Sequence, residues 1–464
     1  MESRSVRKVD DDEALSLARC VAERLMASAG DAERTTDLGQ GAPGVALALR
    51  YAAEVFDDDR YLKAGHRQLR RTAETSATAP LTSAGLYSGT AGFVWVVAEY
   101  ARLEPRYLPT LATMTDRLSG QAMALKLPLS AGSVADHDYD VIMGAAGRLA
   151  TLLKAADVLG APATGAAREA TDSLVDYLLD LTHDDGGKPR WFCAPSRYPS
   201  SPGTDGSPVA LPWYSASFPN GMYNLGFAHG LPGILAALCR ADAAHTAGVP
   251  GVSGIAGRSE RGAARAHRVR QRIRDIVRQL DAWRVDRAGH PTWASALPPD
   301  PDTGLPDITA FQPPGRAAWC YGAPGVAVSL LSASAVGGDP DVADLATAAL
   351  AGVERTSAEQ RRLYSPTVCH GLSGLLAVCV RAAAQTRAPG LREMCDDLRS
   401  RLCAHADPDH PYLFAEQPEP GKLAHRAGLL SGAAGVLLTL LGTVSPAAAQ
   451  WDEVLFLTQS DVRA

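Results

Sequence analysis

The sequence predicts an all-α protein, an α/α toroid in which seven outer helices wrap seven inner helices. Three observations predict this fold. A Gly-x-x-Gly motif followed by an apolar run recurs seven times along the 464 residues. Amphipathic stretches lie between the motifs, and no clear run of alternating apolar and polar residues separates them. Repeats of this kind are supersecondary units that bury their apolar faces against their neighbours.

The motif copies are spaced like pairs of helices. Their intervals are 48, 55, 86, 92, 49 and 61 residues. Even the shortest interval holds two helices of about 11–12 residues together with their connections. The seven copies are GAPGVALAL from Gly41, GTAGFVWVV from Gly89, GAAGRLATL from Gly144, GLPGILAAL from Gly230, GAPGVAVSL from Gly322, GLSGLLAVC from Gly371 and GAAGVLLTL from Gly432.

Each motif is predicted to start an inner helix. Glycine permits a tight turn and close packing, and three copies carry proline as their third residue, where an early helical turn tolerates it. The apolar run leaves little polar face, so the helix is buried on most sides. Amphipathic stretches such as 11–27, 166–181 and 342–355 are the expected outer helices. An open solenoid would use the same repeats and is the alternative arrangement.

The composition excludes a disordered chain and a protein whose whole surface is basic. Hydrophobic residues make up 46% of the chain, and 45 Lys and Arg against 51 Asp and Glu give a net charge of -6. A chain with this balance buries a core and has no general affinity for polyanions, so we expect no nucleic-acid partner. Residues 258–284 carry nine arginines, and we interpret them as a solvated outer helix rather than as a binding surface for an acidic peptide or RNA.

The sequence favours a cytoplasmic protein. Charged residues occur throughout the N-terminal segment, which lacks the apolar region of a secretory signal. The longest uncharged stretch, 427–451, contains glycine, serine and proline and repeats the helix-start motif, so we interpret it as a buried inner helix and expect no membrane span. Eight cysteines are too dilute for a disulfide scaffold and are expected to be reduced thiols.

Two long intervals contain irregular insertions, near 183–224 and 286–318. Both are rich in proline and glycine, carry aromatic residues, and lie just ahead of a motif. Long loops with aromatic side chains on a rigid scaffold are candidates for a substrate cleft. We therefore expect residues 1–464 to form a single toroid domain with insertions at these two places.

Four of the seven helix starts carry side chains that could bind a metal ion or act as an acid or base. They supply Asp140, His229, Cys320 and the pair Cys369-His370, each one to four residues before the first glycine of a motif. If all motifs open at one end of the toroid, these side chains converge on its central cavity. The other three starts are preceded by Gln40, Ser88 and Ser431, which suggest no particular chemistry.

Cys320, Cys369 and His370 are predicted to bind Zn²⁺. Zinc takes thiolates and imidazole tetrahedrally, and three protein ligands leave a fourth position for water or substrate. Two thiolates cancel the charge of the ion, so a substrate thiolate bound there would stay deprotonated and nucleophilic. Isolated cysteines are more often small core residues, but these two occupy equivalent points of consecutive repeats.

Three further residues have alternative interpretations. His229 is either a fourth metal ligand, which would close the site, or a general acid/base. Asp140 either orients an imidazole or contacts substrate, or it simply caps a helix N-terminus. Arg316, four residues before Cys320, either stabilises a developing oxyanion or is an ordinary surface arginine.

The motifs WCYGAPG, CHGLSG and HGLPG, on the seven-fold scaffold, resemble those of the lantibiotic cyclases, the lanthionine synthetase C-like family. The resemblance covers the chain from about Asp37 to Leu441, and the WCYG and CHG pair is highly specific. It implies an α/α toroid with catalytic zinc held by Cys320, Cys369 and His370. The resemblance also implies functional roles for four further positions: His229 as acid/base, Asp140, Arg316 and Tyr321.

The implied activity is that of a stand-alone zinc-dependent lanthipeptide cyclase. A cysteine of a dehydrated precursor peptide would bind zinc as thiolate and add to the β-carbon of dehydroalanine or dehydrobutyrine. Protonation of the enolate would then give a lanthionine or methyllanthionine ring. Zinc would activate the thiol and the cavity would restrain the peptide. A dehydratase and an exporter are the partners that the family implies.

Three alternatives use the same residues or the same fold. A related enzyme would add glutathione or another free thiol to dehydroamino acids. A toroidal glycosidase or zinc prenyltransferase would share the ring, but a glycosidase relies on paired carboxylates and needs neither Cys320 nor Cys369. A non-catalytic scaffold would bind a peptide around structural zinc and show no turnover.

Overall fold

The computed structural model describes most of the chain. The described residues are 7–28, 35–79, 81, 83–124, 132–160, 165–183, 188–202, 208–210, 212–249, 260–310 and 315–457. The two long insertions therefore fall partly outside the described residues, at 184–187, 203–207, 211 and 311–314.

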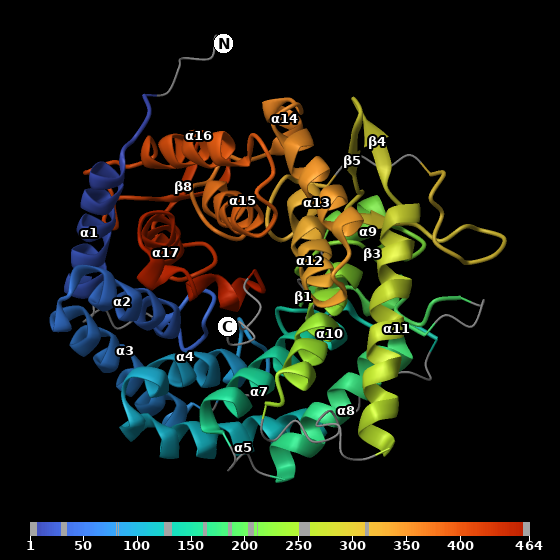
Figure 1. The fold of residues 1–464 in the computed structure, drawn as a ribbon, viewed down its shortest axis with the longest axis horizontal. Helices are drawn as coiled ribbons and strands as arrows, with labels where there is room; N and C mark the ends of the chain where they lie inside the picture. The colour runs from blue at the N-terminus through green and yellow to red at the C-terminus, as the bar shows by residue number, and fades with distance from the viewer. Residues whose placement is uncertain are drawn as a thin grey trace.

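The described helices form two concentric rings, as Figure 1 shows. Each Gly-x-x-Gly motif begins a helix of the inner ring, and the amphipathic stretches form the outer ring. The inner helices are α2 (Ala42–Phe56), α4 (Thr90–Leu103), α7 (Ala145–Leu159), α10 (Leu231–Thr246), α12 (Gly322–Gly337), α15 (Leu372–Thr386) and α17 (Ala433–Val444). The outer helices are α1 (Asp11–Ala27), α3 (Asp59–Thr78), α5 (Leu108–Ala124), α8 (Gly165–Leu181), α11 (Glu260–Ala282), α13 (Pro340–Val353) and α16 (Leu391–Cys403).

The inner ring is closed. Each inner helix packs against the next, and α17 packs against both α15 and α2, so the last repeat contacts the first. The predicted toroid of seven inner and seven outer helices is therefore confirmed, and the open solenoid is not the arrangement. The uncharged stretch 427–451 contains α17, an inner helix, as expected.

Burial distinguishes the two rings. In α12 every residue from Gly322 to Ser334 is buried, because other helices surround it. The outer helix α11 buries only six residues at helical spacing, including Val269, Ile273 and Leu280. Its arginines pair with acidic residues of neighbouring helices, as in the contacts of Arg265 with Asp176 at 2.7 Å, Arg268 with Asp180 at 2.9 Å and Arg270 with Asp242 at 2.9 Å. These ion pairs agree with the interpretation of this stretch as an outer helix.

The second glycine of each motif lies against the chain that leads into the helix. A Cβ atom at Gly374 would lie 2.0 Å from the carbonyl oxygen of Val368, six residues earlier. The same approach, to the carbonyl six residues earlier, occurs in all seven motifs. The second glycine is therefore needed for lack of space as well as for backbone freedom. The entering loop folds back onto the first helical turn, where only glycine fits.

A circle of backbone hydrogen bonds joins the seven entering loops. Each bond runs from an amide of one loop to a carbonyl of the next, and the seventh returns to the first. The bonds are Gly39 to Tyr87 (3.0 Å), Tyr87 to Ile142 (3.0 Å), Val141 to Ala228 (3.1 Å), Ala228 to Cys320 (3.1 Å), Cys320 to Cys369 (3.3 Å), Cys369 to Leu430 (2.9 Å) and Leu430 to Gly39 (2.8 Å). This circle places the residues before each motif around one opening of the toroid.

Short strands accompany the helices, although no strand pattern is visible in the sequence. The described residues form four two-stranded sheets with strands of two to four residues, too short for an alternating pattern to stand out. The pairs are β1 (Ser200–Pro202) with β2 (Pro208–Ala210), β3 (Tyr223–Asn224) with β6 (Ala296–Leu297), β4 (Val285–Arg287) with β5 (His290–Thr292), and β7 (Glu416–Glu419) with β8 (Lys422–Ala424). The β3–β6 pair joins the two long insertions to each other.

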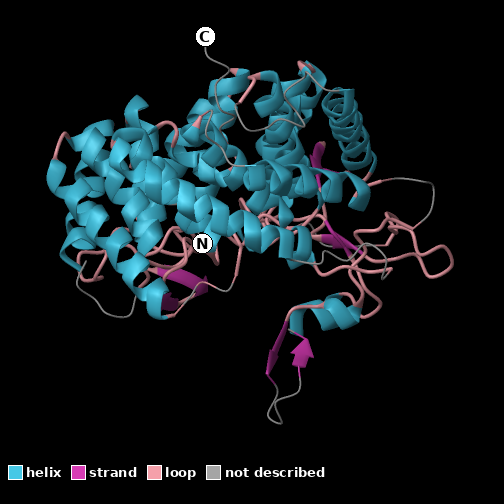
Figure 2. Ribbon diagram, turned by 90° about the horizontal axis from the view of Figure 1, so that it is seen from below, coloured by secondary structure: helices cyan, strands magenta, loops and turns pink. Residues whose placement is uncertain are grey.

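The remaining elements are short. The β1–β2 hairpin and α9 (Pro212–Ser217) project from the body of the toroid (Figure 2). The others are α6 (Asp136–Tyr139), α14 (Ala358–Arg361) and the 3-10 helices η2 (Pro105–Tyr107), η3 (Pro195–Arg197), η4 (Pro446–Ala448) and η5 (Trp451–Leu455). Among the described helices, none has the length and apolar character that crossing a membrane requires.

Candidate active site

The loops before α10, α12 and α15 line a cavity of about 370 Å³. Most of the residues predicted from the sequence to carry chemistry line this cavity. Its lining consists of Tyr214, His229, Ser295, Arg316, Cys320, Tyr321, Arg362, Cys369 and His370. Side chains from distant parts of the chain therefore converge because equivalent loops of several repeats meet here.

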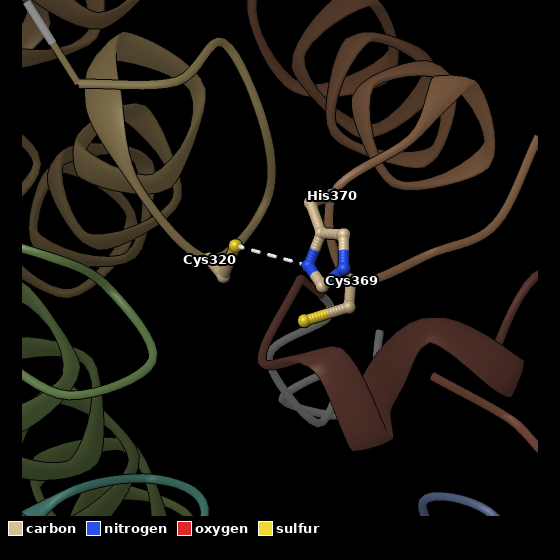
Figure 3. Close-up of side chains that lie close together, drawn as sticks. All are labelled: Cys320, Cys369 and His370. Carbon is tan, nitrogen blue, oxygen red and sulfur yellow. Dashed lines mark hydrogen bonds between the residues drawn. The ribbon is translucent and has the colours of Figure 1, made fainter. Parts of the chain in front are cut away.

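Cys320, Cys369 and His370 form a group whose donor atoms all lie within 4.8 Å of one another. Cys320 belongs to the loop before α12, and Cys369 and His370 belong to the loop before α15; their side chains face one another in Figure 3. Sγ of Cys320 lies 4.0 Å from Nδ1 of His370. Two thiols and one imidazole at this spacing are a donor set that suits Zn²⁺. Within the described chain, His229 is not part of this group.

The pKa values of the two cysteine thiols are shifted in opposite directions. A hydrogen bond from Cys369 lowers the pKa of Cys320 well below its usual range, against the opposing effect of burial, and His370 and Arg316 lower it further. The same contact raises the pKa of Cys369. One thiolate is thus already favoured, which prepares the pair for a cation because metals bind the deprotonated form.

His229 is held by Asp140. Its Nδ1 lies 2.6 Å from Oδ2 of Asp140, and because a carboxylate accepts hydrogen bonds, Nδ1 carries the proton. Burial alone would lower the pKa of His229, but the hydrogen bond and the charges of Asp140, Asp136 and Cys320 raise it to about 9. The imidazole is therefore protonated near neutral pH and lines the same cavity as the thiols.

Asp140 performs both of the structural roles that the sequence left open. Oδ1 accepts hydrogen bonds from the amides of Met143 and Gly144, at 2.6 and 2.7 Å, which caps the entry to α7. Oδ2 is then free to orient His229. The carboxylate is only 1% exposed, so its position is fixed by these contacts and not by solvent.

Tyr321 lines the cavity beside His229. Its ring centroid lies 6.2 Å from that of His229, and its hydroxyl accepts a hydrogen bond from Asn224 at 3.2 Å. The ring covers Gly226, where any side chain would collide with it. Burial raises the pKa of Tyr321 above its usual range, so the phenol stays neutral. The loops of α10 and α12 are thereby held against each other.

Several site residues were not predicted from the sequence. Tyr214 lines the cavity and donates a hydrogen bond to Oδ2 of buried Asp136 at 3.1 Å. Arg362 also lines it, seven residues ahead of Cys369. The sequence offered one indication of Asp136, which lies in the acidic cluster DHDYD at 136–140 together with Asp140. The structure shows that Asp136 is buried, which is unusual for a charged residue. Nothing in the sequence near Arg362 or Tyr214 points to the site.

The C-terminal segment, residues 451–457, supports these loops from within the ring. The indole Nε1 of Trp319 donates to the carbonyl of Leu455 at 3.0 Å, and the hydroxyl of Tyr87 donates to that of Val454 at 2.6 Å. Phe456 packs against Phe227, with ring centroids 5.9 Å apart. Trp319 directly precedes Cys320, and Phe227 lies two residues before His229, so the segment braces both sides of the cavity.

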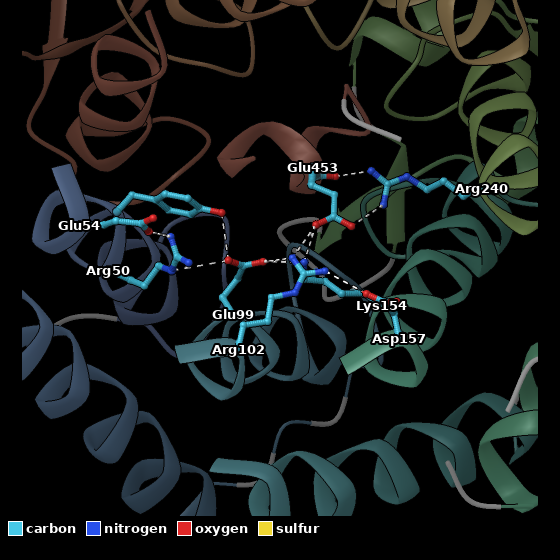
Figure 4. Close-up of polar contacts among 9 residues, drawn as sticks. Arg50, Glu54, Glu99, Arg102, Lys154, Asp157, Arg240 and Glu453 are labelled. Carbon is cyan, nitrogen blue, oxygen red and sulfur yellow. Dashed lines mark hydrogen bonds and ion pairs between the residues drawn. The ribbon is translucent and has the colours of Figure 1, made fainter. Parts of the chain in front are cut away.

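A buried network of charges holds this segment in place (Figure 4). Nζ of Lys154 lies 2.5 Å from carboxylate oxygens of both Glu99 and Glu453. Arg102 pairs with both glutamates, and Arg240 donates to the backbone carbonyl of Glu453. Glu99, Lys154 and Arg240 each lie ten residues after the first glycine of a motif, so equivalent positions of three inner helices meet on the axis.

The comparisons with known proteins agree on one family. The family model described as "Lanthionine synthetase C-like protein" matches residues 33–456. This range includes all seven Gly-x-x-Gly motifs and every residue of the cavity lining.

Two relatives extend this match. The chain is 24% identical over 348 residues to "Nisin biosynthesis protein NisC" of Lactococcus lactis subsp. lactis, covering 74% of this chain and 72% of that protein. The structure of the present chain resembles that of "Nisin cyclase" with a TM-score of 0.71 and 20% sequence identity, over 97% of this chain and 98% of the other. At this identity the structural likeness shows the fold, which is the toroid described above.

Proposed function

The chain belongs to the lanthionine synthetase C-like family, and on that premise we propose that it is a zinc-dependent lanthipeptide cyclase. The reaction is intramolecular addition of a peptide cysteine to dehydroalanine or dehydrobutyrine. The new bond joins the cysteine sulfur to the β-carbon, and the product is a lanthionine or methyllanthionine thioether. The names of the two relatives, which concern nisin biosynthesis and cyclisation, support this activity.

The proposed metal ligands are Cys320, Cys369 and His370. The donor set fits zinc, because two thiolates balance the charge of the ion and three protein ligands leave one position open. When bound, zinc supplies a Lewis acid that keeps a substrate thiol deprotonated near neutral pH. The proposed role of the loop circle is to fix the distance between Cys320 and Cys369, whose backbones it joins directly.

His229 is the proposed proton donor. As the C–S bond forms, the π electrons of the carbon–carbon double bond shift to the bond between the α-carbon and the carbonyl carbon. The carbonyl π electrons move onto oxygen, and the product is an enolate. The α-carbon must then take up a proton, and a protonated imidazole with a raised pKa supplies one at neutral pH. Asp140 is a positioning residue, because it orients His229 and stabilises its protonated form.

Arg316 and Tyr321 complete the proposed machinery. The enolate carries one negative charge on oxygen, and Arg316 is the proposed group that stabilises this charge. It lines the cavity with Cys320, to which it is near enough to favour the thiolate. Tyr321 is proposed to hold the peptide beside His229, since its ring packs near the imidazole on the cavity wall.

The observation that carries the proposal is the meeting of a Cys2His donor group and an Asp–His pair in one cavity of a family member. We also propose that residues 1–464 act as one domain, in the cytoplasm, on a dehydrated precursor peptide supplied by a dehydratase. Export of the cyclised peptide by a transporter would follow.

The test is ring formation on a dehydrated peptide that contains one cysteine and one dehydroalanine. Cyclisation leaves the mass unchanged, so rings are counted as the loss of alkylatable thiol by mass spectrometry. Wild type is expected to consume the thiol and His229→Ala is expected to fail while retaining zinc. Loss of zinc in His229→Ala would make His229 a ligand instead.

A second assay separates the related activity. Glutathione and a dehydropeptide without cysteine are offered to the same protein, and addition is followed as the mass gain of one glutathione. The proposal expects cyclisation to be faster than this addition. Addition without cyclisation would assign the protein to free-thiol chemistry, and metal binding without either reaction would leave a peptide-binding scaffold.

A further inference from the structure

The cavity contains a second arginine that the proposed chemistry does not use. Arg362 and Arg316 both line it, and both are partly buried. Their segments lie side by side, because the amide of Ala317 donates to the carbonyl of Arg361 at 3.2 Å. Two guanidinium groups therefore share one wall beside Cys320, Cys369 and His370.

The backbone holds Arg362 in an unusual conformation. Its φ angle is +50°, a left-handed value that non-glycine residues seldom adopt. The preceding residue is anchored on both sides, since Arg361 accepts the bond from Ala317 and its guanidinium pairs with Glu354 at 2.8 Å. Such conformations persist where the surrounding contacts enforce them, and they cluster at functional sites.

Neither arginine of the cavity has a counter-ion. Among the described residues, no hydrogen bond or ion pair engages the guanidinium of Arg316 or Arg362, whereas other partly buried arginines such as Arg265 and Arg381 have carboxylate partners. Burial lowers the pKa of Arg362, and repulsion from Arg316 adds to this. Within the described part of the chain, no direct ion pair therefore balances the positive charge of this wall.

The nearby carboxylates are already engaged. Asp140 binds His229 at 2.6 Å, and Asp136 accepts a hydrogen bond from Tyr214 at 3.1 Å. The negative charge of Glu416 raises the pKa of Cys369, and Glu416 pairs with Arg426 at 2.6 Å. Each of the three thus has a partner of its own, and the two arginines remain available to a ligand.

A charge count of the proposed reaction leaves one arginine unused. One negative charge is present throughout: it starts on the substrate thiolate and ends on the enolate oxygen. Arg316 is assigned to that charge. Arg362 then gains a direct anionic partner if the substrate brings a second anion that does not react.

We propose that Arg362 binds a carboxylate of the substrate close to the reacting cysteine. This inference rests on the proposed function. A guanidinium presents paired N–H donors that match a carboxylate, which makes Arg362 a specificity-determining residue for an acidic neighbour. The carboxylate belongs either to the C-terminus of the peptide or to an Asp or Glu side chain beside the cysteine.

The first test measures thiol binding to the zinc-loaded protein by calorimetry. N-acetylcysteine and N-acetylcysteinamide differ only in the terminal carboxylate; Ac-Asp-Cys-NH2 and Ac-Asn-Cys-NH2 differ only in the side-chain carboxylate. We expect the acid of at least one pair to bind about tenfold more tightly, the scale of a charge-assisted hydrogen bond. The pair that shows the preference identifies the source of the carboxylate.

Two variants assign that preference to a residue. Arg362→Gln is expected to abolish it without weakening binding of the neutral thiols. Arg355→Gln is the matched control, because Arg355 is exposed and lines a separate pocket with Gly352 and His290. Equal affinity for acid and amide in both pairs would overturn the proposal, as would a preference that survives Arg362→Gln or that Arg355→Gln also removes.

A second test needs no metal. In zinc-stripped protein, a site thiolate displaces iodide from iodoacetate, which is an anion, or from neutral iodoacetamide. The ratio of the two rates is expected to fall several-fold in Arg362→Gln and to stay unchanged in Arg355→Gln. An unchanged ratio in Arg362→Gln would contradict a free positive charge at this wall.

The outcomes also separate this inference from the function on which it rests. If the protein cyclises peptides but shows no carboxylate preference, only the role of Arg362 is wrong. If folded, zinc-loaded protein binds none of the four thiols, the proposed thiol chemistry fails and the inference falls with it.

Discussion

Nδ1 of His229 lies 2.6 Å from Oδ2 of Asp140 and joins the third and fourth repeats of the toroid. The backbone reinforces the same junction, since the amide of Val141 donates to the carbonyl of Ala228 at 3.1 Å. The pair is thus built from two loops that the fold holds in fixed register. This rigidity allows a buried carboxylate to set the protonation of an imidazole in the cavity.

Asp140→Asn is expected to lower the pKa of His229 from its value of about 9, because burial remains while the nearest negative charge is lost. Amide oxygen still accepts the hydrogen bond, so the ring keeps its place. NMR titration of the His229 ring checks the shift, and the alkaline limb of the cyclisation profile should move to lower pH with it. An unchanged pKa in Asp140→Asn would refute the assignment.

The stability of the protein should depend on His229 between pH 6.5 and 9. Its pKa is raised on folding, from 6.5 to about 9, so the stabilisation is complete below 6.5 and disappears as the pH rises through 9. Urea unfolding of wild type and His229→Gln at matched metal content measures this. The difference in free energy of unfolding should be larger at about pH 6 than at about pH 9.5, and a difference independent of pH would contradict it.

Gly374→Ala is expected to destabilise the protein by at least about 1–3 kcal/mol, the usual cost of overpacking. The new Cβ would lie 2.0 Å from the carbonyl oxygen of Val368, which directly precedes Cys369. Metal affinity should fall as well, because the entering loop must move. Gly337→Ala is the control, since nothing lies within 4 Å of its Cβ position. Urea unfolding and metal titration compare the two, and equal stability would show that the close approach is unimportant.

Glu453→Ala is expected to cost about 3–5 kcal/mol, the scale of breaking a buried ion pair. It removes one of the two carboxylates that contact Lys154 and the carboxylate that pairs with Arg240. The exposed pair of Glu419 and Lys422 provides the control, and Glu419→Ala should cost less than about 1 kcal/mol. Chemical denaturation measures both. A small effect of Glu453→Ala would mean that the C-terminal segment does not brace the ring.

The sequence predicted the fold and most of the cavity because both depend on a repeat. Seven equivalent helix starts require equivalent surroundings, so the spacing predicts inner helices whose entering loops lie at one end. The packing of α17 against α2 shows that the ring is closed and excludes the open solenoid. Cys320 and Cys369, 49 residues apart, could be placed together only through that equivalence. The family resemblance implied a role for Tyr321, which the spacing did not single out, and it favoured the functional interpretation of Arg316 over that of an ordinary surface arginine.

Other features depend on contacts that leave no local pattern. The β3–β6 pair consists of two residues from each of two irregular insertions, so its register is set by the tertiary fold. Glu453 lies outside every motif, and nothing in its local sequence links it to Glu99, Lys154 and Arg240, which it meets only in the folded protein. Arg362 lies outside every motif, and it reaches the cavity through tertiary contacts such as the backbone bond between Ala317 and Arg361.

The central claim is that Cys320, Cys369 and His370 hold a zinc ion that the reaction requires. The most direct measurement is the zinc content of purified wild type beside Cys320→Ala, Cys369→Ala and the control Cys395→Ala, with ring formation assayed on the same samples. We predict about one zinc per chain in wild type and control, with loss of both metal and ring formation in the two site variants. Folded wild type that forms rings without metal would contradict the claim.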